Sequence, residues 1–102
     1  MKLKFDWDPI KNNLNIKKHR VDFREAKTVF YDPNMVRIDD EEHSSDTEER
    51  FLVIGLNRKE MELTVCHCFK NGNDIIRIIS ARHATNTEKE IYNEAKEAEL
   101  YD

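Results

Sequence analysis

The sequence has little glycine and little proline, two residues of each among 102, and no stretch of low complexity. A chain with so few of these residues is not a collagen-like repeat, a flexible linker or a disordered tail. Long apolar runs are also missing, and none approaches the ~20 residues that a membrane-spanning helix needs. The first residues lead directly into charged sequence, so we expect no signal peptide and a cytoplasmic protein without membrane contact.

Cysteine is scarce as well, since Cys66 and Cys68, which flank His67, are the two cysteines of the chain. In a strand, residues i and i+2 face one way and residue i+1 faces the other. Three side chains in this arrangement do not chelate one metal ion, and a disulfide between such near neighbours would be strained. We expect reduced, packed thiols. A zinc pattern, a glycine-rich phosphate loop and a nucleophile elbow are all missing, so we expect no metal and no cofactor.

The charge is small in sum and strongly segregated along the chain. The formal net charge is −4, but residues 1–28 carry +4 and residues 50–83 carry +3, whereas residues 29–49 carry −7 and residues 84–102 carry −4. Two basic blocks that fold together make one positive face, which is what binding to phosphate groups requires. The acidic blocks then lie elsewhere or cover that face until a partner moves them.

The N-terminal part of the sequence predicts a strand and a helix. Apolar and charged residues alternate over residues 2–7, which is the pattern of a half-buried strand. Asp8 and the proline that follows it are typical of an N-cap and a first helical residue, so a helix is expected over residues 9–19. We expect Ile10 and Leu14 to be turned inward from this helix.

A second helix and four further strands follow. Asp22 is expected to cap a helix over residues 23–30, which Pro33 prevents from continuing. The acidic segment 39–49 contains no apolar residue and is expected to be a mobile loop. Apolar or alternating runs between turn residues predict short strands at residues 35–38, 51–56, 63–69 and 74–81.

The last predicted element is a helix over residues 87–100. Thr85 or Thr87 is expected to cap it, and the segment Thr87–Glu90 has the form of a capping box. The order β-α-α-β-β-β-β-α predicts a single α+β domain over residues 1–102. In this fold class two N-terminal helices and a C-terminal helix pack around a mainly antiparallel sheet.

The segment Asp74–His83 carries the most information about function. Isoleucines on both of its faces indicate a central strand, where an arginine is costly to bury without a partner. Arg77 therefore has two interpretations. It forms an internal salt bridge to a loop carboxylate, or it holds a guanidinium on a rigid strand to bind phosphate through two hydrogen bonds. Arg82 lies at the end of the strand, where a functional role is favoured.

Three basic residues outside this segment also have two interpretations each. His67, in the middle of the neighbouring strand, is either a hydrogen-bonded core residue or a general acid or base. Lys18 and His19 end the first helix, where cations either stabilise the helix dipole or contact RNA. Sequence spacing leaves both pairs of interpretations open.

Arg50 lies between the acidic loop and a predicted strand. It either pairs with Glu48 or Glu49 or faces a ligand. The loop itself, residues 39–49, lacks the glycine and the ligand spacing of a calcium site, so we interpret it as solvated.

Three ordered motifs resemble the BrnT toxin family. The first runs from Trp7 to Pro33 and has the form W-D-P-x-K-x-x-x-N-I-x-K-H-x-V-x-F-x-E-A-x-x-V-F-x-D-P. The second, E-R-F-L-x-I-G, begins at Glu49, and the third, R-I-I-S-A-R-x-A-T, begins at Arg77. The resemblance misses mainly the acidic loop and the C-terminal helix. One departure is Arg20, which stands where the family usually has glycine.

The resemblance implies a RelE-like fold and a ribonuclease toxin of a bacterial type II toxin–antitoxin pair. The implied partners are an RNA substrate and a BrnA-like antitoxin, with which the toxin forms a hetero-oligomer. DNA is contacted indirectly, through the antitoxin. RNA supplies its own nucleophile, the 2′-hydroxyl group, so metal-independent acid–base cleavage is expected.

Such an endoribonuclease needs an acid, a base and positive charge on the developing transition state. The expected site residues are His67 as acid or base, with Glu49 as second candidate, Arg77 and Arg82 on the transition state, and Arg50, Lys18, His19 and Lys70 along the RNA backbone. The alternative is a catalytically inactive module that binds antitoxin or RNA, which the net charge of −4 and the acidic loop favour.

Overall fold

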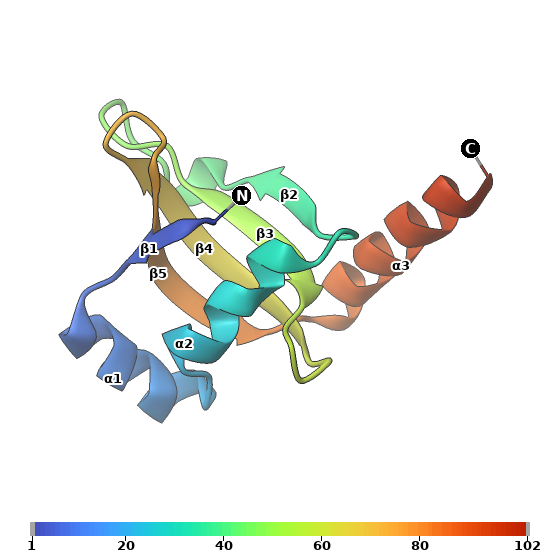
Figure 1. The fold of residues 1–102 in the computed structure, drawn as a ribbon, viewed down its shortest axis with the longest axis horizontal. Helices are drawn as coiled ribbons and strands as arrows, with labels where there is room; N and C mark the ends of the chain where they lie inside the picture. The colour runs from blue at the N-terminus through green and yellow to red at the C-terminus, as the bar shows by residue number, and fades with distance from the viewer. Residues whose placement is uncertain (1, 102) are drawn as a thin grey trace.

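Five strands form one sheet with the order β1-β5-β4-β3-β2 (Figure 1). The computed structural model describes residues 2–101. Strands β2 to β5 pair as an antiparallel meander and β1 joins β5 in parallel, which confirms the α+β class with a mainly antiparallel sheet. The elements in chain order are β1 (Lys4–Asp6), α1 (Pro9–His19), α2 (Phe23–Ala26), the 3₁₀ helix η1 (Lys27–Tyr31), β2 (Val36–Asp39), the 3₁₀ helix η2 (Glu41–His43), β3 (Phe51–Leu56), β4 (Glu62–Lys70), β5 (Ile75–His83) and α3 (Asn86–Tyr101).

Asparagine residues shape the turns of the β3–β4 and β4–β5 hairpins. In the β4–β5 turn, Asn71, Gly72 and Asn73 have φ angles of 53°, 65° and 74°. Glycine adopts this left-handed region freely, and asparagine adopts it more easily than most residues. In the β3–β4 turn, the side-chain oxygen of Asn57 accepts the backbone N–H groups of Lys59 and Met61, each at 2.9 Å. Both turns fix the register of the strands that they join.

Helix α1 begins as its sequence predicts, but it is oriented differently. Asp8 accepts the backbone N–H of Ile10 at 2.9 Å, as an N-cap does. The helix buries Asn12 and Asn15, whereas Ile10 and Leu14 are 70% and 60% exposed. The expectation that these two apolar residues turn inward is therefore wrong.

Asn15 explains the orientation of α1, because its amide connects the helix to β5. It donates to the carbonyl groups of Val21 and Ala81, both at 2.8 Å, and accepts the N–H of Ala81 at 3.0 Å. Burying this amide satisfies backbone groups that would otherwise be unpaired. The helix ends at Arg20, whose φ of 61° is the conformation in which glycine is usual.

The predicted second helix is split in two. Asp22 caps α2, but α2 has four residues and continues as η1, a tighter 3₁₀ helix. Asp32 and Pro33 then end the helical segment. Asp32 also accepts the N–H of Leu56 at 2.8 Å and the hydroxyl group of Tyr92 at 2.7 Å, so it joins η1 to β3 and α3.

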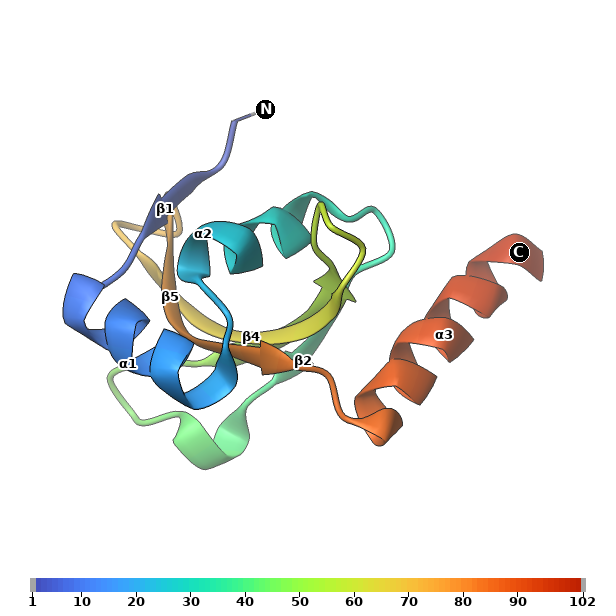
Figure 2. The same cartoon turned by 90° about the horizontal axis from the view of Figure 1, so that it is seen from below.

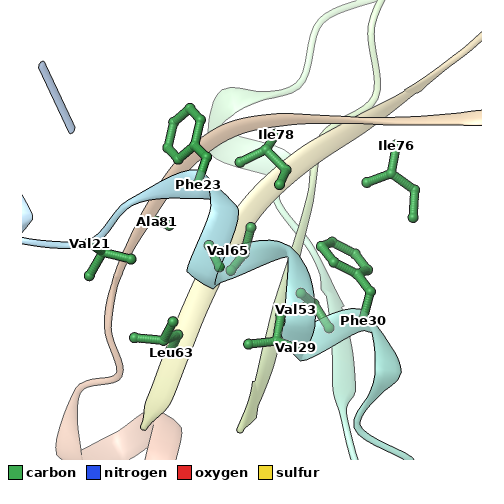
Figure 3. Packing of buried hydrophobic residues seen from close by; sticks show 11 residues of the cluster. Val21, Phe23, Val29, Phe30, Val53, Leu63, Val65, Ile76, Ile78 and Ala81 are labelled. Carbon is green, nitrogen blue, oxygen red and sulfur yellow. The ribbon is translucent and has the colours of Figure 1, made fainter. Parts of the chain in front are cut away.

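The main core lies between the sheet and the segment formed by α2 and η1 (Figure 2 and Figure 3). We call this side of the sheet the core face. A fully buried aliphatic or aromatic side chain stabilises the fold by about 1.5–3 kcal/mol relative to exposure. The buried residues of this cluster are Val21, Phe23, Ala26, Val29, Phe30, Val53, Leu63, Val65, Ile76, Ile78 and Ala81.

The opposite side of the sheet, here called the groove face, is covered unevenly. The segment around η2 lies on this side in Figure 2, while α1 flanks β5 and the first turns of α3 flank β3 and β2. Near α3 a small second cluster buries Ile54, Ala84 and Tyr92. Between these flanking elements the sheet stays partly open, and the candidate site lies there.

Helix α3 begins at Asn86, one residue earlier than expected. The hydroxyl group of Thr85 accepts the N–H of Glu88, and the Glu88 carboxylate accepts the N–H of Thr85 at 2.9 Å. Of the two predicted caps the structure therefore has Thr85, and the capping box is Thr85–Glu88 and not Thr87–Glu90. Beyond its first turns α3 extends away from the sheet (Figure 1).

Candidate functional site

A bulge in β5 places Arg77 and Arg82 on the same face of the sheet. Cys66 of β4 pairs with Ser80 and His67 pairs with Ile78, so Ile79 is an extra residue in the ladder. Residues five apart in an undisturbed strand face opposite sides, but one extra residue reverses that alternation. The two arginines therefore both face the groove side.

The cross-strand partners show this directly. Arg77 lies opposite Cys68 and Arg82 lies opposite Thr64, two residues of β4 that share a face. Five residues of strand separate the arginines by roughly 16 Å, so they do not hold the same phosphate group.

A cavity of about 240 Å³ opens on the groove face at the Arg82 end. Its floor contains Leu52, Cys66 and Ser80, which are cross-strand neighbours on β3, β4 and β5. The remaining lining residues are polar or belong to the bulge: Asp40, Glu42, His43, Arg50, Ile79 and Arg82. The cavity thus brings together two guanidinium groups and one imidazole group from three separate segments.

Arg82 is held by Glu88, the capping residue of α3. Its two terminal nitrogens donate to the two carboxylate oxygens of Glu88 at 2.6 and 3.0 Å. Burial by itself would raise the pKa of Glu88, but Arg82, the N–H of Thr85 and the hydroxyl group of Thr64 outweigh burial and lower this pKa to about 2. Glu88 therefore stays ionised and fixes the guanidinium group at the edge of the cavity.

Arg50 is held in a similar way at the start of β3. Its Nε donates to Glu48 at 2.8 Å, and Lys70 contacts the other oxygen of the same carboxylate at 3.3 Å. The hydrogen bonds from Arg50 and then Lys70 lower the pKa of Glu48. Of the two partners considered for Arg50, the structure thus selects Glu48 and leaves Glu49 out.

Glu49 and Lys70 lie outside the cavity that holds Arg50 and Arg82. They line a separate hollow of about 360 Å³ at the hairpin end, together with Phe51 and Phe69. The structure therefore brings Arg50 and Arg82 to one cavity. Glu49 and Lys70 line the other hollow, although Lys70 shares the Glu48 carboxylate with Arg50.

Lys18 and His19 extend the site on the α1 side. They line a shallow hollow of about 190 Å³ that shares Ile79 and Ser80 with the main cavity. Partial burial, followed by the charges of Lys18 and Arg82, lowers the pKa of His19. The sharing of two residues shows that the two hollows adjoin, so both predicted α1 residues flank the site.

His67 lies on the core face instead. It is 1% exposed, and its ring meets the rings of Phe30, Phe51 and Phe69 at centroid distances of 4.8, 5.9 and 5.5 Å. Burial lowers its pKa to about 4, although a hydrogen bond to the carbonyl group of Val65 opposes this shift. The structure places this side chain in the core, on the far side of the sheet from the cavity.

Arg77 forms an internal ion pair, but its partner is not in a loop. It contacts the carboxylate of Asp6 at 2.5 Å, and Asp6 is its neighbour on the parallel strand β1. Both side chains are partly exposed. The pair therefore supports the parallel edge of the sheet, outside the cavity.

Sequence reasoning missed His43 and Asp40, which the acidic loop brings into the cavity. Nδ1 of His43 lies 3.0 and 3.1 Å from the two carboxylate oxygens of Asp40. Asp40 is 7% exposed, although we expected the loop to be solvated throughout. The available signal was an aspartate and a histidine three residues apart.

The two thiols are free and buried, as the sequence predicts. Burial raises the pKa of Cys66 to about 11, and the nearby Asp40 carboxylate adds to this shift. Cys66 is therefore a neutral donor in the cavity, with its Sγ 3.6 Å from an oxygen of Asp40.

Two features are absent from the part of the chain that the structure describes. Over residues 2–101, no group of three or more histidine, cysteine, aspartate or glutamate side chains is arranged to hold a metal ion. Within the same range no helix is both long enough and apolar enough to cross a membrane.

The fold and the cavity define a class: a small α+β protein whose open sheet face presents guanidinium and imidazole groups suited to a phosphate ligand. The sequence model of the ribonuclease toxin BrnT of type II toxin–antitoxin systems matches residues 7–88 of this chain. The chain belongs to this family. The matched region includes Arg50, Arg82 and the whole of the cavity.

A comparison with solved structures agrees on the fold. The crystal structure of the Brucella abortus ribonuclease toxin BrnT superposes with a TM-score of 0.60 at 22% sequence identity, covering 83% of this chain and 100% of that chain. The comparison with curated protein sequences finds no match. The family description implies an RNA target and an antitoxin partner.

Proposed function

We propose that this protein is an endoribonuclease toxin that cleaves RNA without a metal ion, in the groove-face cavity that η2, β3, β4 and β5 line. One observation carries the proposal. The family match spans residues 7–88, and within that span the structure gathers Arg50, Arg82 and His43 around one cavity.

The chemistry follows from what RNA brings to the site. The 2′-hydroxyl group attacks the neighbouring phosphate, and negative charge builds up on the phosphate oxygens in the transition state. Arg82 and Arg50 supply fixed positive charge at two sides of the cavity, while Lys18 and His19 contact adjoining phosphates along the α1 hollow. A guanidinium group has five N–H donors, so Arg82 keeps donors free while it is paired with Glu88.

The remaining parts of the proposal concern fold family and partners. The three-helix α+β arrangement supports a RelE-like relationship, and the toxin family supports a BrnA-like antitoxin that forms a hetero-oligomer with this chain. DNA would then be contacted through the antitoxin. We place the activity in the cytoplasm, where RNA and antitoxin are both present.

The test is cleavage of a defined RNA by purified protein, with EDTA present. We expect cleavage to persist, with products that end in a 2′,3′-cyclic phosphate and a 5′-hydroxyl group. Arg82→Ala should lower the rate by about 100-fold, the effect of removing one preorganised electrostatic donor. Arg77→Ala is the matched control, an ion-paired arginine on the same face of the same strand, and should stay within about twofold of wild type.

Two results would count against this assignment. Loss of cleavage in EDTA contradicts the metal-independent mechanism. Equal rates for wild type and Arg82→Ala contradict the location of the site. Thermal unfolding of each variant separates loss of chemistry from loss of fold, since Arg82→Ala leaves Glu88 without its partner.

The second candidate is a module that binds antitoxin or RNA without cutting. It is favoured by two salt bridges, because Glu88 pairs with Arg82 and Glu48 pairs with Arg50, so both arginines of the cavity already have a carboxylate partner. Under this alternative the RNA is retained intact in a binding assay and no cyclic phosphate forms.

A further inference from the structure

We propose that His43 is the general base of the cleavage reaction and that Asp40 is its positioning residue. The inference rests on the proposed function, because it assigns a role within the same cavity.

The His43–Asp40 pair has the geometry of a catalytic imidazole that a carboxylate holds in position. The side chain of His43 is 58% exposed and lines the cavity, whereas that of Asp40 is 8% exposed. Nδ1 of His43 reaches both oxygens of Asp40, at 3.0 and 3.1 Å. A buried carboxylate therefore orients an accessible ring, which is how a histidine base is held in place in enzymes.

The backbone around Asp40 is fixed to the start of β3. Its N–H donates to the carbonyl group of Arg50 at 3.0 Å, and its carbonyl group accepts the hydroxyl group of Ser44 at 2.7 Å. The hydroxyl oxygen of Ser44 in turn accepts the N–H of Arg50 at 2.8 Å. The dyad and Arg50 therefore belong to one hydrogen-bonded unit, so the base is held at a set place beside a phosphate-binding group.

The protonation pattern of the pair suits a base. Because Nδ1 donates its hydrogen to the carboxylate, the neutral ring carries its lone pair on Nε2. In the proposed step, Nε2 accepts the proton of the 2′-hydroxyl group as the 2′ oxygen forms a bond to phosphorus. The bond from phosphorus to the 5′ oxygen breaks, and that oxygen takes a proton from solvent water.

Charged and titratable groups face the dyad from each neighbouring strand and from its own segment. Glu42 lies beside it on η2, Arg50 on β3, Cys66 on β4 and Arg82 on β5. Arg50 and Arg82 bring positive charge to the cavity around the dyad, and Glu42 brings negative charge.

The experiment compares His43→Gln with Asp40→Asn and with a matched control, His83→Gln. His83 is an exposed histidine at the end of β5 outside the cavity. We expect His43→Gln to lower the cleavage rate by about 10²–10⁴-fold, the usual contribution of a general base. Asp40→Asn should fall between His43→Gln and wild type, and His83→Gln should stay within about twofold of wild type.

Two readouts separate a catalytic role from a structural one. Binding of an RNA analogue with 2′-deoxyribose at the scissile position should be unchanged in His43→Gln, because the ring acts on the hydroxyl proton and not on affinity. The cleavage rate of wild type should rise with pH on its acidic limb, and that limb should be lost in His43→Gln. Unfolding midpoints show whether Asp40→Asn remains folded.

Full cleavage by His43→Gln overturns this inference and leaves the proposed function intact. A wild-type protein that cuts no RNA overturns both. A loss of analogue binding that matches the loss of rate also overturns it, since His43 would then act in binding.

Discussion

The two faces of the sheet are made by the same three strands and have opposite characters. On the core face, alternate residues of β3, β4 and β5 pack under α2 and η1 and are almost completely buried. On the groove face, the residues in between line a cavity with two arginines, an aspartate and a histidine. Alternation along a strand lets one sheet serve stability on one side and chemistry on the other.

His67 and His43 show what this difference does to one residue type. His67 is enclosed by aromatic rings, and burial lowers its pKa to about 4, so it stays neutral in the core. His43 is exposed and has a buried carboxylate as its partner. A histidine in the sequence is therefore a candidate for catalysis only once its face is known.

The largest expected effect tests the difference in packing between the two faces of the sheet, with two adjacent isoleucines of β5. Ile78 is 1% exposed on the core face, and Ile79 is the half-buried bulge residue that lines the cavity. Ile78→Ala should lower the free energy of unfolding by about 2–5 kcal/mol, because it removes a buried side chain and leaves a cavity. Ile79→Ala should cost about 1 kcal/mol. Urea denaturation measures both, and equal costs would show that the two faces are equally packed.

The next effect concerns His67 and the pH dependence of stability. Its pKa is about 4 in the folded protein against an ordinary 6.5, so below pH 6.5 the unfolded chain binds a proton that the folded chain does not. Stability should therefore fall as the pH falls from 6.5 towards 4, by up to about 3 kcal/mol.

His67→Leu should remove this part of the pH dependence when urea denaturation is repeated between pH 7 and pH 4, and it should leave RNA cleavage intact. His83→Gln is the control and should keep the wild-type slope. Loss of cleavage by a folded His67→Leu variant would restore the prediction, made from the sequence, that His67 is the acid or base.

The smallest effect tests the groove face through Glu88. Its pKa is about 2 in the folded protein against an ordinary 4.5, so its contribution is complete above pH 4.5 and is lost as the pH falls towards 2. This contribution is about 2–3 kcal/mol. Glu88→Gln should lower the unfolding free energy at neutral pH and flatten its dependence below pH 4.5.

Glu90→Gln, an exposed carboxylate on the same helix, should keep the wild-type dependence. The measurement is urea denaturation from pH 6 to pH 2.5. An unchanged acid limb in Glu88→Gln would show that the pair with Arg82 contributes little to folding.

Local patterns gave the elements of this fold with good accuracy. Alternation and turn residues placed all five strands, and the Asp8 and Asp22 caps are found where the sequence predicts them. Predictions from local sequence were wrong where a contact with a residue far along the chain decides the orientation of an element. Nothing within α1 shows that Asn15 will bind the backbone of β5, so its apolar residues were expected to face inward. Glu88 is a second example. Its hydrogen bond to Thr85 is local, but its pairing with Arg82 depends on where β5 places that arginine.

The candidate site was predicted in part. Arg82, Arg50, Lys18 and His19 surround the cavity and its adjoining hollow, whereas His67, Glu49, Arg77 and Lys70 lie elsewhere. The four that lie elsewhere were placed by residue type and by position in a strand. Residue type predicts chemistry well, but it does not say which face or which end of a sheet a side chain occupies.

The sequence by itself determined the α+β class, the strand order along the chain, the helix caps and the family, because these depend on local spacing and on ordered motifs. Tertiary structure decided where the candidate site lies and which residues it brings together. A one-residue bulge beside Ile79 turned Arg77 and Arg82 to one face, and packing of the acidic loop against β3 brought Asp40 and His43 to the cavity. Both depend on cross-strand register and on long-range contacts. The alternation of residues along one strand carries no information about either.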